Sequence, residues 1–237
     1  MVPVERIAVV IPCLNEAETI GALVEKVRRI LPFVLVVDDG STDQTASLAA
    51  QSGAEIIRHS EPQGKGAALQ AGWTRLHQLG FEFVLTLDGD GQHSPNDIPK
   101  FLAALKNNAL IVGNRMAEVG KIPFVRRQTN RWMSRRLSEL AKQNLPDTQC
   151  GFRLMNLQAW SKLQLITTHY EIESELLLAF AAAGYAIAFV PIEVIYENEE
   201  SKIQPFRDTV RWFRWYFKMR KKFKIASVQP AVEPAKI

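Results

Sequence analysis

The sequence predicts an α/β fold, a mostly parallel sheet with helices on both faces. Short apolar runs without polar alternation recur through the first 113 residues, and stretches of helical period separate them. Strands of that kind are buried on both faces, which is typical of a parallel sheet between two layers of helices. The length of 237 residues, with 47% hydrophobic and 23% charged residues, suits one soluble globular domain.

The N-terminal half supplies five expected strands, at residues 7–11, 33–37, 54–58, 81–87 and 109–113. Each run is rich in aliphatic residues and is stopped by polar residues or glycine. The intervening stretches predict helices at about 17–31, 43–51, 64–79 and from 95 onward. Thr42 or Asp43 caps the second helix, Gly80 ends the third and Pro95 opens the fourth.

The pattern is looser after Gly113. We expect a basic helix at about 124–142, a loop at 146–151, a buried helix ending at Gly184 and a strand at 186–190. Residues 176–192 carry no charge and fall just short of a membrane span, but Gly184 and Pro191 interrupt them, so helix plus strand is the simpler interpretation. A basic, aromatic helix is expected at about 205–224, followed by a disordered tail at 227–237.

Charge is distributed unevenly along the chain. The net charge is +4, but residues 1–110 carry 9 Lys and Arg against 13 Asp and Glu, and the remainder carries 20 against 12. A basic second half suggests anionic ligands or an anionic membrane surface. Cys13 and Cys150 are too few for a disulfide framework, and the run at 7–11 is too short for a signal-peptide core. We therefore expect a cytoplasmic protein.

Polar residues follow four of the expected strands, in the segments 12–16, 38–41, 88–93 and 113–115. Ligands of open parallel sheets bind beyond these carboxyl ends. In the third segment, Asp88 and Asp90 flank Gly89, and paired carboxylates suit Mg²⁺ or Mn²⁺ held together with substrate phosphates. A capped turn uses the same residue types. The clustering of the four segments, with Gln92 close by, favours the metal.

Several motifs together resemble glycosyltransferase family 2, and more narrowly its dolichyl-phosphate mannose synthase branch. They are AVVIPCLNE at 8–16, DDGSTD at 38–43, DGDGQH at 88–93, GNR at 113–115, DTQCGFR at 147–153 and SK at 201–202. The resemblance implies a GT-A fold over residues 1–226. Its nucleotide-binding half would span about 1–115 and its acceptor half about 116–226. The implied reaction is inverting transfer of a sugar from a nucleotide-diphosphate sugar to a polyprenyl phosphate.

The resemblance also implies roles for individual residues. The nucleoside would be held by Pro12, Leu14, Glu16, Val37 and Asp39. Asp88 and Gly89 would lie at the ribose or sugar, and Asp90 and Gln92 would hold Mg²⁺ or Mn²⁺. Arg115, Arg131 and Lys202 would face the diphosphate or the acceptor phosphate. Leu14 stands where the family commonly has Tyr, Gly89 replaces its usual Ala, and the Arg and Gly that often precede the Ser-Lys pair are missing.

Three alternatives stay open. The acceptor could be a hydroxyl of a sugar, lipid or protein, with Asp147 as the base. A sugar-phosphate nucleotidyltransferase would open with a glycine-rich, Arg-containing loop after its first strand, and this chain has none there. A non-catalytic nucleotide-binding protein is the third. Nothing but positive charge suggests nucleic acid. The helix at 205–224 combines Lys and Arg with Trp, Tyr and Phe, as interfacial helices do, which predicts a protein peripheral to an anionic membrane.

Overall fold

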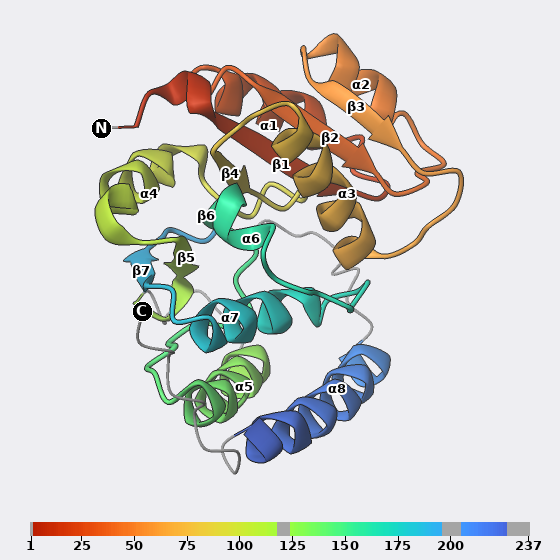
Figure 1. Cartoon of the computed structure of the whole chain (residues 1–237). Helices are drawn as coiled ribbons and strands as arrows, with labels where there is room; N and C mark the ends of the chain where they lie inside the picture. The colour runs from red at the N-terminus through yellow and green to blue at the C-terminus, as the bar shows by residue number, and fades with distance from the viewer. Residues whose placement is uncertain (1, 118–123, 196–204, 227–237) are drawn as a thin grey trace. The chain divides into compact units, whose positions relative to one another are not determined.

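A computed structural model of the chain describes residues 2–117, 124–195 and 205–226. One seven-stranded sheet of order β3-β2-β1-β4-β6-β5-β7 forms its centre (Figure 1). The strands are β1 (Ile7–Cys13), β2 (Val34–Asp38), β3 (Glu55–Arg58), β4 (Phe83–Thr86), β5 (Leu110–Asn114), β6 (Arg153–Asn156) and β7 (Ile187–Pro191). The helices are α1 (Ile20–Arg28), α2 (Thr45–Gln51), α3 (Lys65–Gln78), α4 (Ile98–Ala104), α5 (Phe124–Ala141), α6 (Leu157–Trp160), α7 (Ile172–Ala182) and α8 (Pro205–Ala226).

The sheet is mostly parallel, as predicted, and its central strands are buried throughout. Every residue of β1 and β2 is buried, which explains why their sequences show no polar alternation. α1 lies behind these strands in Figure 1 and α3 in front of them. Gly72 lets α3 approach closely, because a β-carbon there would lie 2.4 Å from Val10 Cγ2 and 3.1 Å from Val37 Cγ2. Val37 is therefore a core residue, and its side chain is 0% exposed.

β6 is the one strand of the described sheet that the sequence analysis did not predict. It lies between β4 and β5 and pairs antiparallel with both. Its four residues begin with Arg153, a residue type that seldom occurs in a buried strand. The guanidinium of Arg153 is accommodated because it donates to three backbone carbonyls, those of Cys150 (2.7 Å), Glu173 (2.6 Å) and Thr148 (3.0 Å).

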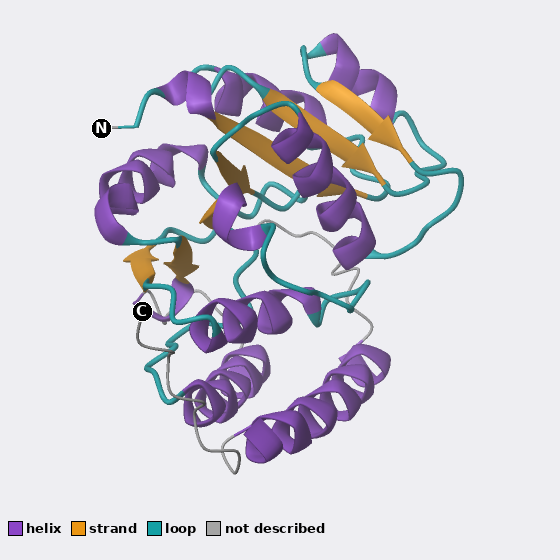
Figure 2. Ribbon diagram, viewed as in Figure 1, coloured by secondary structure: helices purple, strands orange, loops and turns teal. Residues whose placement is uncertain are grey.

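The uncharged stretch 176–192 forms part of α7, a turn at Gly184 and β7, as predicted (Figure 2). Gly184 has a φ of 77°, the left-handed conformation that commonly ends helices. None of the helices in the described ranges is long and apolar enough to cross a membrane.

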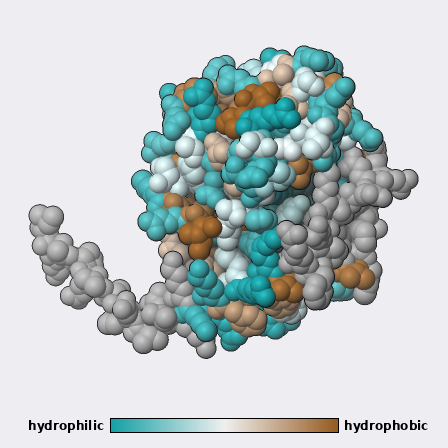
Figure 3. Space-filling model, turned by 90° about the vertical axis from the view of Figure 1, so that its right-hand side faces the viewer, coloured by the Kyte–Doolittle hydropathy of each residue, from teal (hydrophilic) through white to brown (hydrophobic). Residues whose placement is uncertain are grey.

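Contacts divide the chain into two compact units, residues 1–200 and 201–237. The first contains the sheet and α1 to α7, and the second contains α8. Hydrophobic residues on one face of the surface form small patches among hydrophilic ones (Figure 3). In the first unit the large exposed ones are Val4, Leu79, Val125, Trp132 and Ile166. The predicted tail at 227–237 and Lys202 lie outside the described residues.

Candidate active site

Hydrogen bonds join the loop that follows β1 to the loop that follows β2. Asn15 adopts a left-handed backbone with φ 54°, which asparagine tolerates better than most residues. Its N–H donates to Ser41 Oγ (2.9 Å), and its side-chain oxygen accepts from the Thr42 N–H (2.9 Å). The N–H of Glu16 donates to Thr45 Oγ1 (2.8 Å). These bonds give the carboxyl end of the sheet a rigid rim.

Asp39 anchors the segment that leads into α3. Its carboxylate is 4% exposed and accepts from the N–H groups of Gln63 (3.0 Å) and Gly64 (2.7 Å). His59 Nδ1 lies 2.7 Å from the same carboxylate. Asp39 was predicted to hold the nucleoside, and the structure shows its carboxylate engaged within the protein.

Asp88 and Asp90 follow β4 and form an acidic pair. Asp88 Oδ1 lies 2.6 Å from Lys65 Nζ, and Asp88 Oδ2 lies 3.9 Å from His93 Nδ1. Burial opposes ionisation of Asp88, but the Lys65 charge outweighs it and lowers the Asp88 pKa to about 2. Asp90 accepts from the Gln92 N–H (3.0 Å), while burial and the charge of Asp88 raise the Asp90 pKa. The loop therefore brings together two carboxylates with opposite pKa shifts, one paired with a lysine and one without such a partner among the contacts described.

The donor set of this loop fits a divalent cation. Burial and the neighbouring Asp88 charge raise the pKa of Asp90, and a divalent cation at this loop would favour its ionised form. No three His, Cys, Asp or Glu side chains in the described ranges are grouped as a complete metal cage. Mg²⁺ typically binds through one or two carboxylates plus substrate phosphates and water. The pair therefore suits a cation that binds together with a nucleoside diphosphate.

A third carboxylate reaches this cluster from α7. Lys65, the first residue of α3, places its Nζ 2.6 Å from Glu173 Oε1 as well as 2.6 Å from Asp88 Oδ1. Burial works against the Lys65 charge, but Asp88 and Glu173 raise the pKa of this amine above its ordinary value. The sequence analysis assigned neither Lys65 nor Glu173 to the site. In sequence, Lys65 stands out only by its place between Gly64 and Gly66, at the start of a predicted helix.

Arg115 and Asp147 form a buried ion pair. The Nε and Nη2 groups of Arg115 donate to the two oxygens of Asp147 at 2.8 and 2.9 Å, and the Arg115 N–H donates at 3.1 Å. Asp147 is 0% exposed, and although burial opposes its ionisation, Arg115 lowers its pKa. The sequence motifs offered Asp147 as a base for a hydroxyl acceptor and Arg115 as a contact for a phosphate. In the structure, each of the two is the buried partner of the other.

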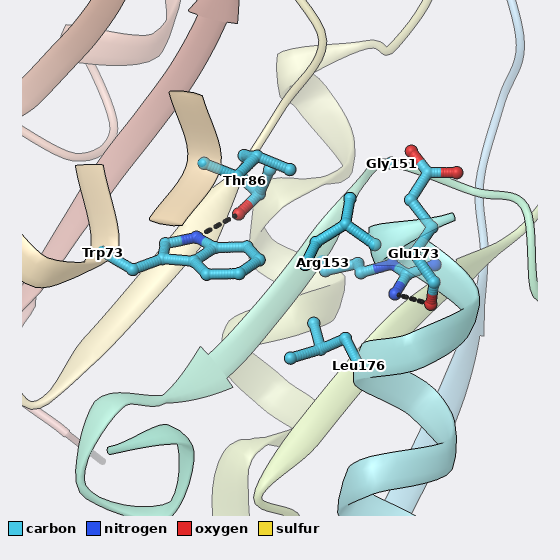
Figure 4. A pocket seen from close by; sticks show the side chains of 8 residues that line it. Trp73, Thr86, Gly151, Arg153, Glu173 and Leu176 are labelled. Carbon is cyan, nitrogen blue, oxygen red and sulfur yellow. Dashed lines mark hydrogen bonds between the residues drawn. The ribbon is translucent and has the colours of Figure 1, made fainter. Parts of the chain in front are cut away.

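A small pocket lies beside the Asp88 loop (Figure 4). Its lining includes Trp73 and Thr86, joined by a hydrogen bond of 3.3 Å, and Arg153, which donates to the Glu173 carbonyl. Gly151 also lines it, and a β-carbon on Gly151 would lie 2.4 Å from Asp88 Oδ2. Gly151 thus lets the Asp88 carboxylate pack against the backbone.

Comparison with known proteins identifies the family. Residues 8–163 match the family model described as glycosyl transferase family 2. The chain belongs to glycosyltransferase family 2. A dolichyl-phosphate hexose transferase of Haloferax volcanii is 31% identical over 206 residues, covering 85% of this chain and 88% of the relative. An undecaprenyl-phosphate mannosyltransferase of Micrococcus luteus is 29% identical over 215 residues, covering 84% and 87%.

A family 2 chain is expected to have a GT-A fold, and solved structures support that fold. Glucosyl-3-phosphoglycerate synthase from Mycobacterium tuberculosis, crystallised with Mn²⁺, UDP and phosphoglyceric acid, superposes with a TM-score of 0.69. The two sequences are 22% identical, and the match covers 92% of this chain and 78% of that one. This similarity establishes the GT-A fold.

The other predicted site residues of this family 2 chain differ in how far they are exposed to solvent. Leu14, Glu16 and Gln92 are half-buried at the rim of the site, and Arg131 is exposed on α5. Pro12 and Gly89 are buried. Val37 was predicted to contact the nucleoside, and the structure buries the whole residue, with its side chain packed beneath α3. Cys150 is 0% exposed, and burial raises the pKa of its thiol to about 12, which argues against a nucleophilic role.

Proposed function

We propose that this glycosyltransferase moves a sugar from a nucleotide-diphosphate sugar, GDP-mannose or a UDP-sugar, to a polyprenyl phosphate at a membrane surface. The observation that carries the proposal is the acidic pair Asp88 and Asp90 at the carboxyl end of β4, in a fold whose central strands end in polar loops. Relatives named as transferases to dolichyl and undecaprenyl phosphate support the lipid acceptor.

The donor would bind over the loops of β1, β2 and β4. Leu14 and Glu16 are half-buried at the rim and accessible to a nucleoside, with Pro12 and Asp39 shaping the floor beneath. Asp88 would face the ribose or sugar, next to Gly89. Asp90 and Gln92 would hold Mg²⁺ or Mn²⁺, which would neutralise the diphosphate as it leaves.

The chemistry needs no strong base. A polyprenyl phosphate oxygen is already anionic near neutral pH, so it can attack C1 of the sugar while the bond from C1 to the diphosphate oxygen breaks. No proton has to be removed, and configuration at C1 inverts. This agrees with the burial of Asp147 inside its ion pair, which argues against a hydroxyl acceptor activated by that residue. Arg131 and Lys202 would face the phosphates, where charge changes during transfer.

A transfer assay tests the proposal directly. Radiolabelled GDP-mannose, UDP-glucose and UDP-N-acetylglucosamine are each offered with Mn²⁺ and a short polyprenyl phosphate. The matched control is the corresponding polyprenol, which presents a hydroxyl on the same lipid. We expect lipid-linked sugar with the phosphate and none with the alcohol. Transfer to the alcohol alone, or to neither lipid with any donor, would reject the proposed acceptor.

A further inference from the structure

Lys65 joins two carboxylates that come from distant parts of the chain. Its Nζ lies 2.6 Å from Asp88 on the β4 loop and 2.6 Å from Glu173 in the first turn of α7. The side chains of Lys65 and Glu173 are 13% and 9% exposed. An ion pair this sheltered is screened far less than a surface pair, so its geometry matters more.

The backbone of Lys65 is also fixed against the segment that precedes α7. The Ala67 N–H donates to the Thr168 carbonyl (3.0 Å). Gly64 and Gly66 leave no room for a side chain, since a β-carbon would lie 2.5 Å from Thr168 O at Gly64 and 2.7 Å from Thr168 C at Gly66. The two glycines therefore dock the start of α3 onto the 168–169 backbone.

The Asp88 carboxylate is held from two sides. Lys65 approaches Oδ1, and the Gly151 backbone packs beside Oδ2. Because a lysine side chain is long and flexible, it fixes a carboxylate only when its own ammonium group is held. Glu173 holds this ammonium group at 2.6 Å, and the Tyr170 ring lies beneath it, 5.7 Å from Nζ to the ring centroid.

We propose that Glu173 is a positioning residue for donor binding. It holds Lys65 against Asp88, and Lys65 in turn fixes the direction of the Asp88 carboxylate that receives the donor. The inference rests on the proposed function for the site that Asp88 serves, and it adds α7, in the expected acceptor half, to the groups that prepare the donor site. Glu173 acts through Lys65 and needs no contact with the substrate.

A matched control stands two residues along the same helix. Glu175 is also buried and also charged, but its carboxylate accepts from the N–H groups of Ile166 and Thr167 and from Thr167 Oγ1. Glu175→Gln removes a buried charge from α7 without touching Lys65. If Glu173 had only a structural role, Glu173→Gln and Glu175→Gln would affect nucleotide affinity alike.

The experiment measures the affinity of GDP and UDP, each with Mn²⁺, by calorimetry, together with the melting temperature of each variant. We expect Glu173→Ala to weaken nucleotide binding by about tenfold or more, the scale of one charged hydrogen bond. Glu173→Gln, which keeps an acceptor oxygen of the same shape, should weaken it less. Glu175→Gln should lower the melting temperature and leave the affinity within about twofold, since its carboxylate bonds to the 166–167 segment and not to Lys65.

Two results would overturn the positioning role. One is wild-type affinity in both Glu173 variants, and the other is an equal loss of affinity in Glu175→Gln. The proposed function fails in a different way. Wild-type protein that binds nucleotide but transfers no sugar to polyprenyl phosphate would refute the acceptor, while the role of Glu173 is still decided by the affinities. Wild-type protein that binds neither nucleotide would refute both.

Discussion

The sulfur of Cys13 fills the space beside Gly89, where the β1 and β4 loops meet. A β-carbon on Gly89 would lie 2.6 Å from Cys13 Sγ and 3.2 Å from Glu16 Cγ. Glycine stands here where the family commonly has alanine, and the thiol occupies the room that the alanine methyl would need. The two residues therefore complement each other and set how closely the Asp88 loop approaches the rim.

Gly89→Ala should destabilise the protein by about 1–3 kcal/mol, the usual cost of overpacking. The double variant Cys13→Ala/Gly89→Ala should recover most of that loss, because the smaller residue 13 makes room for the methyl group. Chemical denaturation of the two single variants and the double variant gives the coupling energy. If the changes in the free energy of unfolding caused by the two substitutions are additive, the two side chains do not compete for this space.

The Arg115–Asp147 pair predicts a pH-dependent stability. The folded pKa of Asp147 lies below its ordinary value of about 3.9, so the pair stabilises the fold above that pH and is lost as the pH falls through the folded pKa. Asp147→Asn should cost about 3–5 kcal/mol at pH 7, because it leaves a buried guanidinium unpaired. Urea unfolding at pH 7, 5 and 3 should show the gap to wild type narrowing in acid. A gap of constant size would contradict this assignment.

Arg131 should behave differently from Arg115, because it is exposed on α5. If it faces a substrate phosphate, Arg131→Ala should lower kcat at least ~100-fold, the scale of losing a preorganised donor. Its stability should stay within about 0.5 kcal/mol of wild type. Arg135→Ala is the control, since Arg135 lies one turn along the same helix and pairs with Glu139 at 3.6 Å. Equal kinetics in the two variants would place Arg131 among ordinary surface cations.

The parts of the fold that depend on local pattern were predictable from sequence. Continuous apolar runs identified β1, β2 and β4, and the geometry of parallel sheets placed the polar residues after them at one edge. β6 was not predicted, because its burial depends on hydrogen bonds from Arg153 to three backbone carbonyls elsewhere in the chain. The hydrophobic pattern of a four-residue segment carries no information about such long-range hydrogen bonds.

The site was predictable only where its residues belong to strand ends. Asp88, Asp90 and Gln92 follow directly from the end of β4. The Lys65–Glu173 contact joins residues 108 positions apart, and no pattern in the sequence specifies which buried carboxylate a lysine will meet. Likewise, the sequence alone indicates that Asp147 is a loop carboxylate, and only the folded structure shows that Arg115 lies beside it. Both cases depend on long-range packing.

Asp90→Asn tests the metal assignment. It keeps the size of the side chain but removes the charge that a divalent cation would meet, so we expect Mn²⁺ to stop enhancing nucleotide affinity. Because Asp90 lies on a loop, we expect the variant to fold. Its melting temperature should equal or exceed that of wild type, since the substitution removes the repulsion between Asp90 and Asp88. Calorimetric titration of UDP and GDP with Mn²⁺ or EDTA provides the measurement. Undiminished Mn²⁺ enhancement in the variant would remove Asp90 from the metal site.

We propose that one face of α8 meets an anionic membrane. Arg214, Phe217, Lys218 and Lys221 are spaced three and four apart, so they share one side of the helix, and all are exposed. Phe217 is 52% exposed between these cations. An apolar ring among basic residues suits contact with anionic headgroups. The Trp and Tyr rings that also suggested an interfacial helix, Trp212, Trp215 and Tyr216, are buried.

Reversing two of these charges, in Arg214→Glu/Lys218→Glu, should abolish binding to vesicles that contain phosphatidylglycerol, because each basic residue near such a surface contributes about 1 kcal/mol. The matched control is Arg75→Glu/Lys106→Glu, which makes the same change of net charge at exposed positions on other elements. Its binding should fall much less, because neither residue belongs to the basic face of α8 that we expect to meet the headgroups. Co-sedimentation with phosphatidylglycerol and phosphatidylcholine vesicles separates the two outcomes. Equal, negligible binding of wild type to both lipids, or equal losses in the two variants, would show that α8 has another role.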